Sequence, residues 1–404
     1  MLFERRMLAT VVAGATVIGV STGLAVLALE HLVEDLLHEI FEAPVWVPAL
    51  TVVIGALATA VLVHWVGGRS SASTEVYVSE FHEETPTIDP SHAPGRLAGA
   101  FTTLGSGAPL GLEGPAVYTG SVVATVLRRR VAAFGAGTHN AMLIAAAAAG
   151  IAAVFKAPAS GAIFALEVPF RGRLAGERVL AAVFGSAAGY MTMAAVDGVK
   201  NEIEVPRVDL TYASAASSAL LGVVVGVAAI GVIWLIGRGE HLSEWGSPWV
   251  RALLAGGILA GLYGIGRGIA GESLALRSGN EVIDWAIGGD HAIWLLLAVF
   301  ALRAFGPAVS IAGGGVGGLF IPLMAAGAVL GRLFADARSS EELSLYVTVG
   351  AAAMLGAGYA VPLTAVVFVA EYTGQATMIV PALLAVTAAR IVVGSRSVSP
   401  AQRP

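Results

Sequence analysis

Long apolar runs dominate this sequence and restrict it to folds that a membrane can hold. A helix of about 20 apolar residues crosses the hydrocarbon core of a bilayer. Only 13% of the 404 residues are charged and 56% are hydrophobic, whereas a soluble chain carries about 25% charged residues. The clearest apolar runs cover residues 7–29, 46–66, 178–196, 213–236, 250–269 and 376–393. The sequence therefore predicts an all-α, multi-pass integral membrane protein, which we expect in the cell (inner) membrane.

A glycine-rich stretch from Leu104 to Ser121 interrupts this pattern and carries one carboxylate, Glu113. Gly111 and Pro115 lie on either side of that carboxylate. Because glycine weakens a helix and proline begins one, we expect one helix to end before Glu113 and a second to start beside it. The first N–H groups of the second helix then form an anion site, which Glu113 itself could occupy. A charge in such a break is a functional site by default.

A second set of breaks matches the first at a fixed distance along the chain. Residues 157–167, with an Ala-Pro start and a final Glu167, align with residues 361–371, which have a Val-Pro start and a final Glu371. The offset is 371 − 167 = 204 residues, and the same offset carries Gly114 to Gly318. Paired interrupted helices in two halves point to a transport site near the membrane centre. We therefore expect two repeats, 1–204 and 205–404, that form one membrane domain.

Two of these motifs resemble a known family. GLEGPAV at residues 111–117 is similar to the GREGP element of the CLC chloride channels and transporters, and GGLFIP at residues 317–322 is similar to their GxFxP element. The resemblance covers nearly the whole chain. It implies an inverted-repeat bundle of broken and tilted helices, a homodimer with one pore per subunit in the lipid bilayer, and permeation of chloride or another small anion.

The resemblance also implies roles for individual residues. Glu113 corresponds to the gating glutamate that competes with the anion. Backbone amides would bind the anion, because a fixed cation would hold it too tightly for conduction. The amides implied at the outer anion site are those of Leu112, Glu113, Gly114, Phe320 and Ile321, and those implied at the central site are Leu319 and Phe320.

Three departures from the family pattern bear on mechanism. The first anion motif is degenerate at residues 68–75, where Ser71 is the best candidate for a hydroxyl ligand. The family's pore tyrosine is missing, since residues 393–404 contain no tyrosine. The proton-coupled members carry a second glutamate at the position of Val168, which is apolar here. The loss of that carboxylate favours passive, channel-like conduction gated by Glu113.

Other functions stay open beside passive conduction. Proton-coupled anion exchange is the main alternative, with protons reaching Glu113 through water or through Glu167. Fluoride export is a lesser one, because the degenerate first motif leaves selectivity undefined. A membrane-embedded enzyme is disfavoured, since no histidine is expected deep in the fold beside a second reactive group. We expect no cofactor and no metal, and no basic cluster points to nucleic acid.

The remaining charged residues near apolar runs have structural interpretations. Glu167 and Glu371 end apolar segments, which favours a role as helix caps or interface groups. Arg303 and Arg332 lie near span ends and are expected to be interfacial anchors. Residues 272–290 are polar and are expected to form an extramembrane loop.

Overall fold

The computed structural model describes residues 2–69, 73–83, 87–131, 138–199, 210–340 and 342–404. Within these ranges the regular structure is helical, and eight helices are long and apolar enough to cross a membrane. The α-helices are α1 (Leu2–Glu42), α2 (Trp46–Trp65), α3 (Thr74–His82), α4 (Ala93–Gly105), α5 (Glu113–Arg130), α6 (His139–Phe155), α7 (Pro158–Glu167), α8 (Val179–Asp197), α9 (Tyr212–Ser243), α10 (Pro248–Ala270), α11 (Asn280–Ile287), α12 (Ile293–Ala312), α13 (Phe320–Ala337), α14 (Leu343–Gly358), α15 (Pro362–Thr373) and α16 (Ile379–Val393). The expected all-α membrane fold is confirmed.

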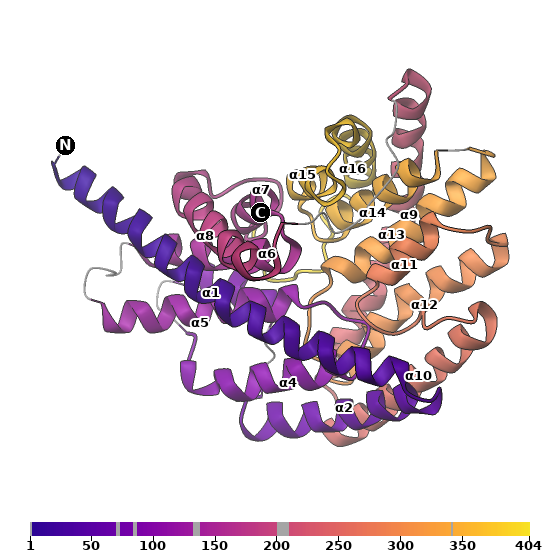
Figure 1. Ribbon diagram of the computed structural model, residues 1–404, viewed down its shortest axis with the longest axis horizontal. Coiled ribbons are helices and arrows are strands. Elements are labelled where there is room, and N and C mark those ends of the chain that lie inside the picture. The colour runs from indigo at the N-terminus through magenta and orange to yellow at the C-terminus, as the bar shows by residue number, and fades with distance from the viewer. Residues whose placement is uncertain (1, 70–72, 84–86, 132–137, 200–209, 341) are drawn as a thin grey trace.

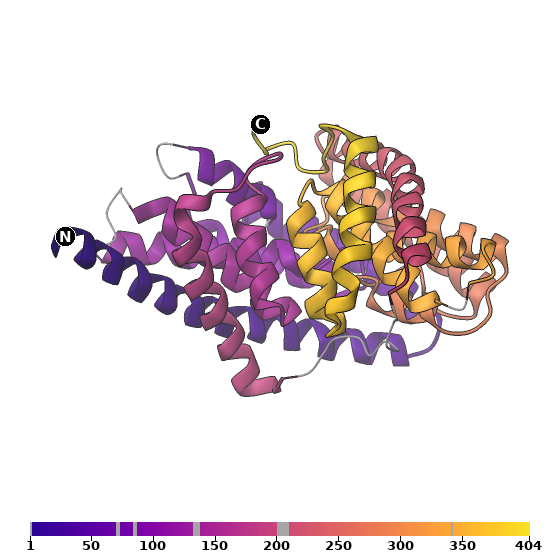
Figure 2. The ribbon, with the colours of Figure 1, turned by 90° about the horizontal axis from the view of Figure 1, so that it is seen from above.

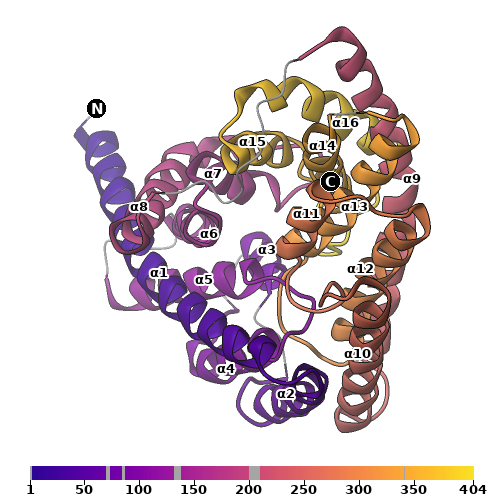
Figure 3. The same ribbon diagram turned by 45° about the vertical axis from the view of Figure 1, so that its right-hand side comes forward.

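The helices form a bundle in which the first half of the chain packs beside the second. Figure 1 shows α1 to α8 mainly on one side and α9 to α16 on the other, and Figure 3 shows the same division after rotation. In Figure 2, α8, α9 and α16 stand upright while α1 lies across them. Several helices are short or strongly tilted, as expected for an inverted-repeat bundle of broken helices.

The two halves share their interruptions in detail. α6 and α7 are separated by Lys156 and Ala157, and α14 and α15 are separated by residues 359–361. Lys156 and Ala360 both have left-handed backbones, with φ of 52° and 57°. Their numbers differ by 360 − 156 = 204, the offset expected from the sequence. Since non-glycine residues seldom adopt positive φ, the shared strain supports a repeated unit, although the boundary at residue 204 stays a prediction.

A reciprocal pair of carboxylates joins the halves where α7 packs against α15. Glu167 accepts hydrogen bonds from the Leu363 N–H at 3.0 Å and the Thr364 N–H at 2.8 Å, in the first turn of α15. Glu371 accepts from the Ala159 N–H at 2.8 Å and the Ser160 N–H at 2.7 Å, in the first turn of α7. Each glutamate therefore caps the helix of the opposite half, where the dipole is positive.

The structure corrects the expectation for Arg303 and Arg332. Both are buried, at 1% and 2% exposure, rather than anchored at the interface. Arg303 donates to the carbonyls of Leu276, Arg277 and Ser278, and Arg332 donates to the carbonyls of Ala286, Gly288 and Gly289. The polar segment 272–290, which contains α11, folds back on the bundle and supplies these acceptors. The following helix, α12, continues through Pro307 to Ala312.

Candidate functional site

The two glycine breaks meet at one point. Gly111 and Gly318 form an isolated antiparallel bridge, with the Gly111 N–H donating to the Gly318 carbonyl at 2.9 Å and the reverse bond at 2.7 Å. A Cβ added at either glycine would overlap the Glu113 carboxylate. A larger residue at either position would therefore displace the Glu113 carboxylate from this meeting point.

Two helices start at this meeting point. α5 begins at Glu113, and α13 begins at Phe320. Each has proline at its third residue, Pro115 or Pro322, so that position has no N–H to satisfy. The unpaired donors of both first turns therefore lie around one place, where two positive dipole ends favour an anion.

Glu113 lies between the two helix starts. Its side chain is fully buried, and Oε1 accepts a hydrogen bond from the backbone N–H of Phe320. Its other oxygen, Oε2, is buried and has no hydrogen-bond partner among the described residues. One carboxylate oxygen thus accepts a hydrogen bond from the start of α13, and the other has none.

Aromatic rings hold the start of α13 in place. The ring of Phe320 is fully buried, with its centroid 4.6 Å from that of Phe155, 4.8 Å from that of Phe368 and 5.9 Å from that of Phe164. These rings come from α6, α15 and α7, so both halves contribute. Such packing fixes the direction of the Phe320 N–H and excludes water from one side of the site.

Two cavities with different linings reach the site. The α1 cavity is lined by Glu34 of α1 and reaches Leu112, Phe155 and Ile321. The tail cavity is lined by Val398 of the C-terminal tail, residues 394–404, and reaches Gly317, Leu319 and Tyr359. Residues predicted at the outer anion site therefore face one cavity, and Leu319 of the predicted central site faces the other.

Tyr359 is a residue of this site that the sequence analysis missed. Its side chain lies close to the Leu319 backbone and the Thr74 side chain and lines the tail cavity. A signal for it existed in the repeat, because 359 − 204 = 155 and Phe155 lines the α1 cavity at the matching place. The matched residues face different cavities, as an inverted repeat requires.

Ser71, the predicted hydroxyl ligand, lies outside the described residues. Its neighbours Ser73 and Thr74 do line the tail cavity, at the start of α3.

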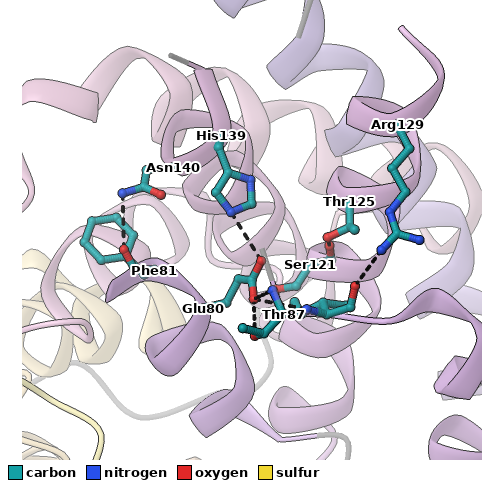
Figure 4. Close-up of polar contacts among 9 residues, drawn as sticks. Glu80, Phe81, Thr87, Ser121, Thr125, Arg129, His139 and Asn140 are labelled. Carbon is teal, nitrogen blue, oxygen red and sulfur yellow. Dashed lines mark hydrogen bonds and ion pairs between the residues drawn. The ribbon is translucent and has the colours of Figure 1, made fainter. Parts of the chain in front are cut away.

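A buried polar cluster holds α3 against α5 and α6 (Figure 4). Glu80 Oε1 lies 3.3 Å from His139 Nε2, and Oε2 accepts from the Thr87 N–H at 2.8 Å and the Thr87 hydroxyl at 2.6 Å. The Asn140 amide donates to the Phe81 carbonyl at 3.2 Å. Burial would raise the pKa of the Glu80 carboxyl, but His139 and Thr87 outweigh it and hold the pKa below its usual value. His139 therefore contradicts the expectation that no histidine lies deep beside a second reactive group.

The position of the second family glutamate carries no proton acceptor. Val168 is fully buried at the end of α7. Its neighbour Glu167, which the sequence analysis names as an alternative proton relay, is 3% exposed. Its carboxylate accepts a hydrogen bond from the Thr364 hydroxyl at 2.7 Å, in addition to those from two backbone N–H groups of α15. Both carboxylate oxygens of Glu167 therefore accept hydrogen bonds from the first turn of α15.

Comparisons with known proteins agree with this architecture. The family model described as "Voltage gated chloride channel" matches residues 54–394. A Yersinia pestis protein named H(+)/Cl(-) exchange transporter ClcA is 29% identical over 323 residues, which cover 74% of this chain and 64% of that relative. The matched region is thus less than two thirds of that relative's length.

Two solved structures share the fold over almost the whole chain. A slow cyanobacterial Cl-/H+ antiporter has a TM-score of 0.85 at 20% identity, with 96% of each chain covered. A CLC-type fluoride/proton antiporter has a TM-score of 0.87 at 21% identity, with 98% of each chain covered.

The fold defines a membrane protein of the inverted-repeat class in which two helices start at one point. The chain belongs to the voltage gated chloride channel family.

Proposed function

We propose that this protein moves chloride or a similar small anion across the membrane in exchange for protons. The observation that carries the proposal is the hydrogen bond from the Phe320 N–H to the Glu113 carboxylate, where α5 and α13 begin. A carboxylate held at an anion site competes with the transported anion. When Glu113 takes up a proton, its attraction to these dipoles weakens and an anion can replace it.

Exchange fits better than the passive conduction that Val168 favours in the sequence. The curated relative above is named as a proton/chloride exchanger, and both similar structures are titled antiporters. Loss of one relay position does not uncouple a protein that has another proton route. The tail cavity offers one, because the carboxylates of Glu75 and Glu240 line it with Tyr359 and interact electrostatically with each other.

We assign the anion sites to backbone N–H groups at the two helix starts. Leu112, Glu113, Gly114 and Ile321 would serve an anion arriving from the α1 cavity, and Leu319 would serve one from the tail cavity. The Phe320 N–H lies between them, and the Tyr359 hydroxyl would take the place of the missing family tyrosine. Peptide dipoles of this kind bind an anion weakly enough to release it.

A homodimer is part of the same proposal. α8 and α16 come from different halves and expose apolar side chains, among them Val183 at 47% and Leu383 at 46%. They flank the α7–α15 contact, and a second copy could cover them. A purified protein that elutes and cross-links as a monomer would contradict this part.

The test measures the reversal potential of the protein in planar bilayers, with chloride equal on both sides and a pH gradient imposed. Exchange predicts a potential displaced from zero in the direction set by the proton gradient. A potential of zero would support passive conduction instead. Replacing chloride by fluoride in the same setup decides between the proposed anion and the fluoride-exporting alternative.

A further inference from the structure

A groove lies on the outer surface of the bundle between α9 and α10. These consecutive helices both pack on α12, which forms the floor of the groove, and Figure 3 shows the three together at one edge of the molecule. Small residues of α12, Ala308 and Ala312, line the floor. Trp234 on one wall and Leu254 on the other are 63% and 60% exposed. The groove is therefore apolar, open at the side and located on spanning helices.

One end of the groove is cationic. Arg238 of α9 and Arg251 of α10 line it beside the α9–α10 turn, and the described lining contains no acidic residue. Arg251 Nη1 donates to the Trp245 carbonyl at 2.6 Å and the Gly246 carbonyl at 3.0 Å, which holds the guanidinium at this end. Its Nε is buried and has no hydrogen-bond partner in the described part of the chain.

This end lies at the surface where arginines gather. Arg251 also lines the tail cavity with Arg69, and Arg171 donates to the tail carbonyls of Ser395 and Ser399. The α1 cavity is more acidic, with three acidic side chains and one arginine, whereas the tail cavity has two of each. By the positive-inside rule the arginine-rich surface is cytoplasmic, where anionic lipids give the bilayer a negative surface potential.

We propose that the groove binds one anionic phospholipid, with an acyl chain along the α12 floor and the phosphate on Arg238 and Arg251. The apolar walls suit the acyl chain of any phospholipid. The two arginines select a lipid with net negative charge, because a zwitterionic headgroup brings its own cation to them. Each arginine near an anionic headgroup is worth a factor of about five in affinity.

Arg251 is shared by the groove and the tail cavity, whereas Arg238 lines the groove and not that cavity. A change at Arg251 can therefore alter anion transport directly. For this reason the test measures lipid binding itself and does not depend on the proposed transport function.

The test titrates the purified full-length protein with dioleoyl phosphatidylglycerol or dioleoyl phosphatidylcholine and counts retained lipids by native mass spectrometry. The wild type is expected to retain one phosphatidylglycerol preferentially. Arg238→Gln should weaken this binding about fivefold, and the double change with Arg251→Gln about 25-fold. Arg130→Gln, at the exposed end of α5 outside the groove, is the matched control and should change nothing.

Equal retention of the two lipids by the wild type would overturn the proposal. So would an equal loss in Arg130→Gln and Arg238→Gln, because that would indicate a general charge effect. Ala312→Trp fills the floor and should lower retention of both lipids, and unchanged retention would exclude the acyl-chain placement. Competition by inorganic phosphate at the lipid's concentration would show a phosphate site without a lipid.

Discussion

Two of the contacts between the halves of this chain use glutamate in different ways. At the α7–α15 contact, Glu167 and Glu371 occupy matching positions, and each caps the helix of the other half. At the α5–α13 contact, Glu113 has no acidic counterpart, because the position 204 residues later is Gly317. The first contact is symmetric and the second is not.

The difference separates a structural carboxylate from a functional one. Both oxygens of Glu167 have donors, and so have both oxygens of Glu371. Glu113 uses one oxygen on the Phe320 N–H and leaves Oε2 without a partner among the described residues. A fully paired carboxylate is costly to move, whereas a partly paired one can leave its position. This asymmetry is the reason that we propose Glu113 as the group that exchanges with an anion.

The largest effect is expected for Glu113→Gln. The amide cannot carry a negative charge or exchange protons, so proton movement should fall to background while anion flux continues at the wild-type rate or faster. Vesicle assays that record chloride efflux and proton uptake together measure both. Loss of all anion flux from a normally folded variant would show that Glu113 is not a gate.

The next effect is expected for Glu167→Ala, which tests the symmetric contact. This change leaves two amides of α15 in a buried place without acceptors, and the loss should lower the free energy of unfolding by about 3 kcal/mol. Titration with a denaturing detergent, followed by tryptophan fluorescence, measures it. Transport per folded molecule should stay coupled, and selective loss of proton movement would make Glu167 a relay instead.

A smaller effect is expected for Glu371→Ala, the counterpart of Glu167 in the second half. Glu371 is partly exposed, so water can replace its contacts with the amides of Ala159 and Ser160. The free energy of unfolding should fall by about 1 kcal/mol in the same titration. A loss equal to that of Glu167→Ala would show that burial does not distinguish the two caps.

The smallest effect is expected for Phe320→Leu, which keeps the backbone N–H but loosens its aromatic packing. Discrimination between chloride and nitrate should change by less than about tenfold, because the amide donors stay and only their direction relaxes. Competition between the two anions in vesicle efflux measures this ratio. An unaltered ratio would mean that the rings around Phe320 do not shape the site.

The parts of the fold that depend on local chemistry could be predicted from the sequence. Glycine and proline around Glu113 predicted the break, and the 204-residue offset predicted its partner near Gly318. Glu167 and Glu371 were predicted to cap helices, but not to cap each other's helices. The sequence does not show which helix start a glutamate side chain reaches.

The misses depend on contacts that are remote in sequence. The sequence predicts Arg303 and Arg332 as interfacial anchors, because it does not show that they reach buried carbonyl groups. Those carbonyls belong to segment 272–290, whose polar composition is typical of an exposed loop. Tyr359 was missed because only the inverted repeat relates it to Phe155. The contact between His139 and Glu80 was not predicted, because the two residues are 59 positions apart. A separation of that length carries no signal of contact in the sequence.

The double hydrogen bond between Gly111 and Gly318 restricts how the protein can alternate between its two sides. Many carriers rock one repeat against the other around a fixed substrate. Rocking here would pull the paired glycines apart and leave their peptide groups unsatisfied at membrane depth, which is costly. In the function proposed above, the Glu113 side chain leaves the Phe320 N–H while the paired glycine backbones stay in place. Turnover by this side-chain movement needs no rigid-body rearrangement of the subunit.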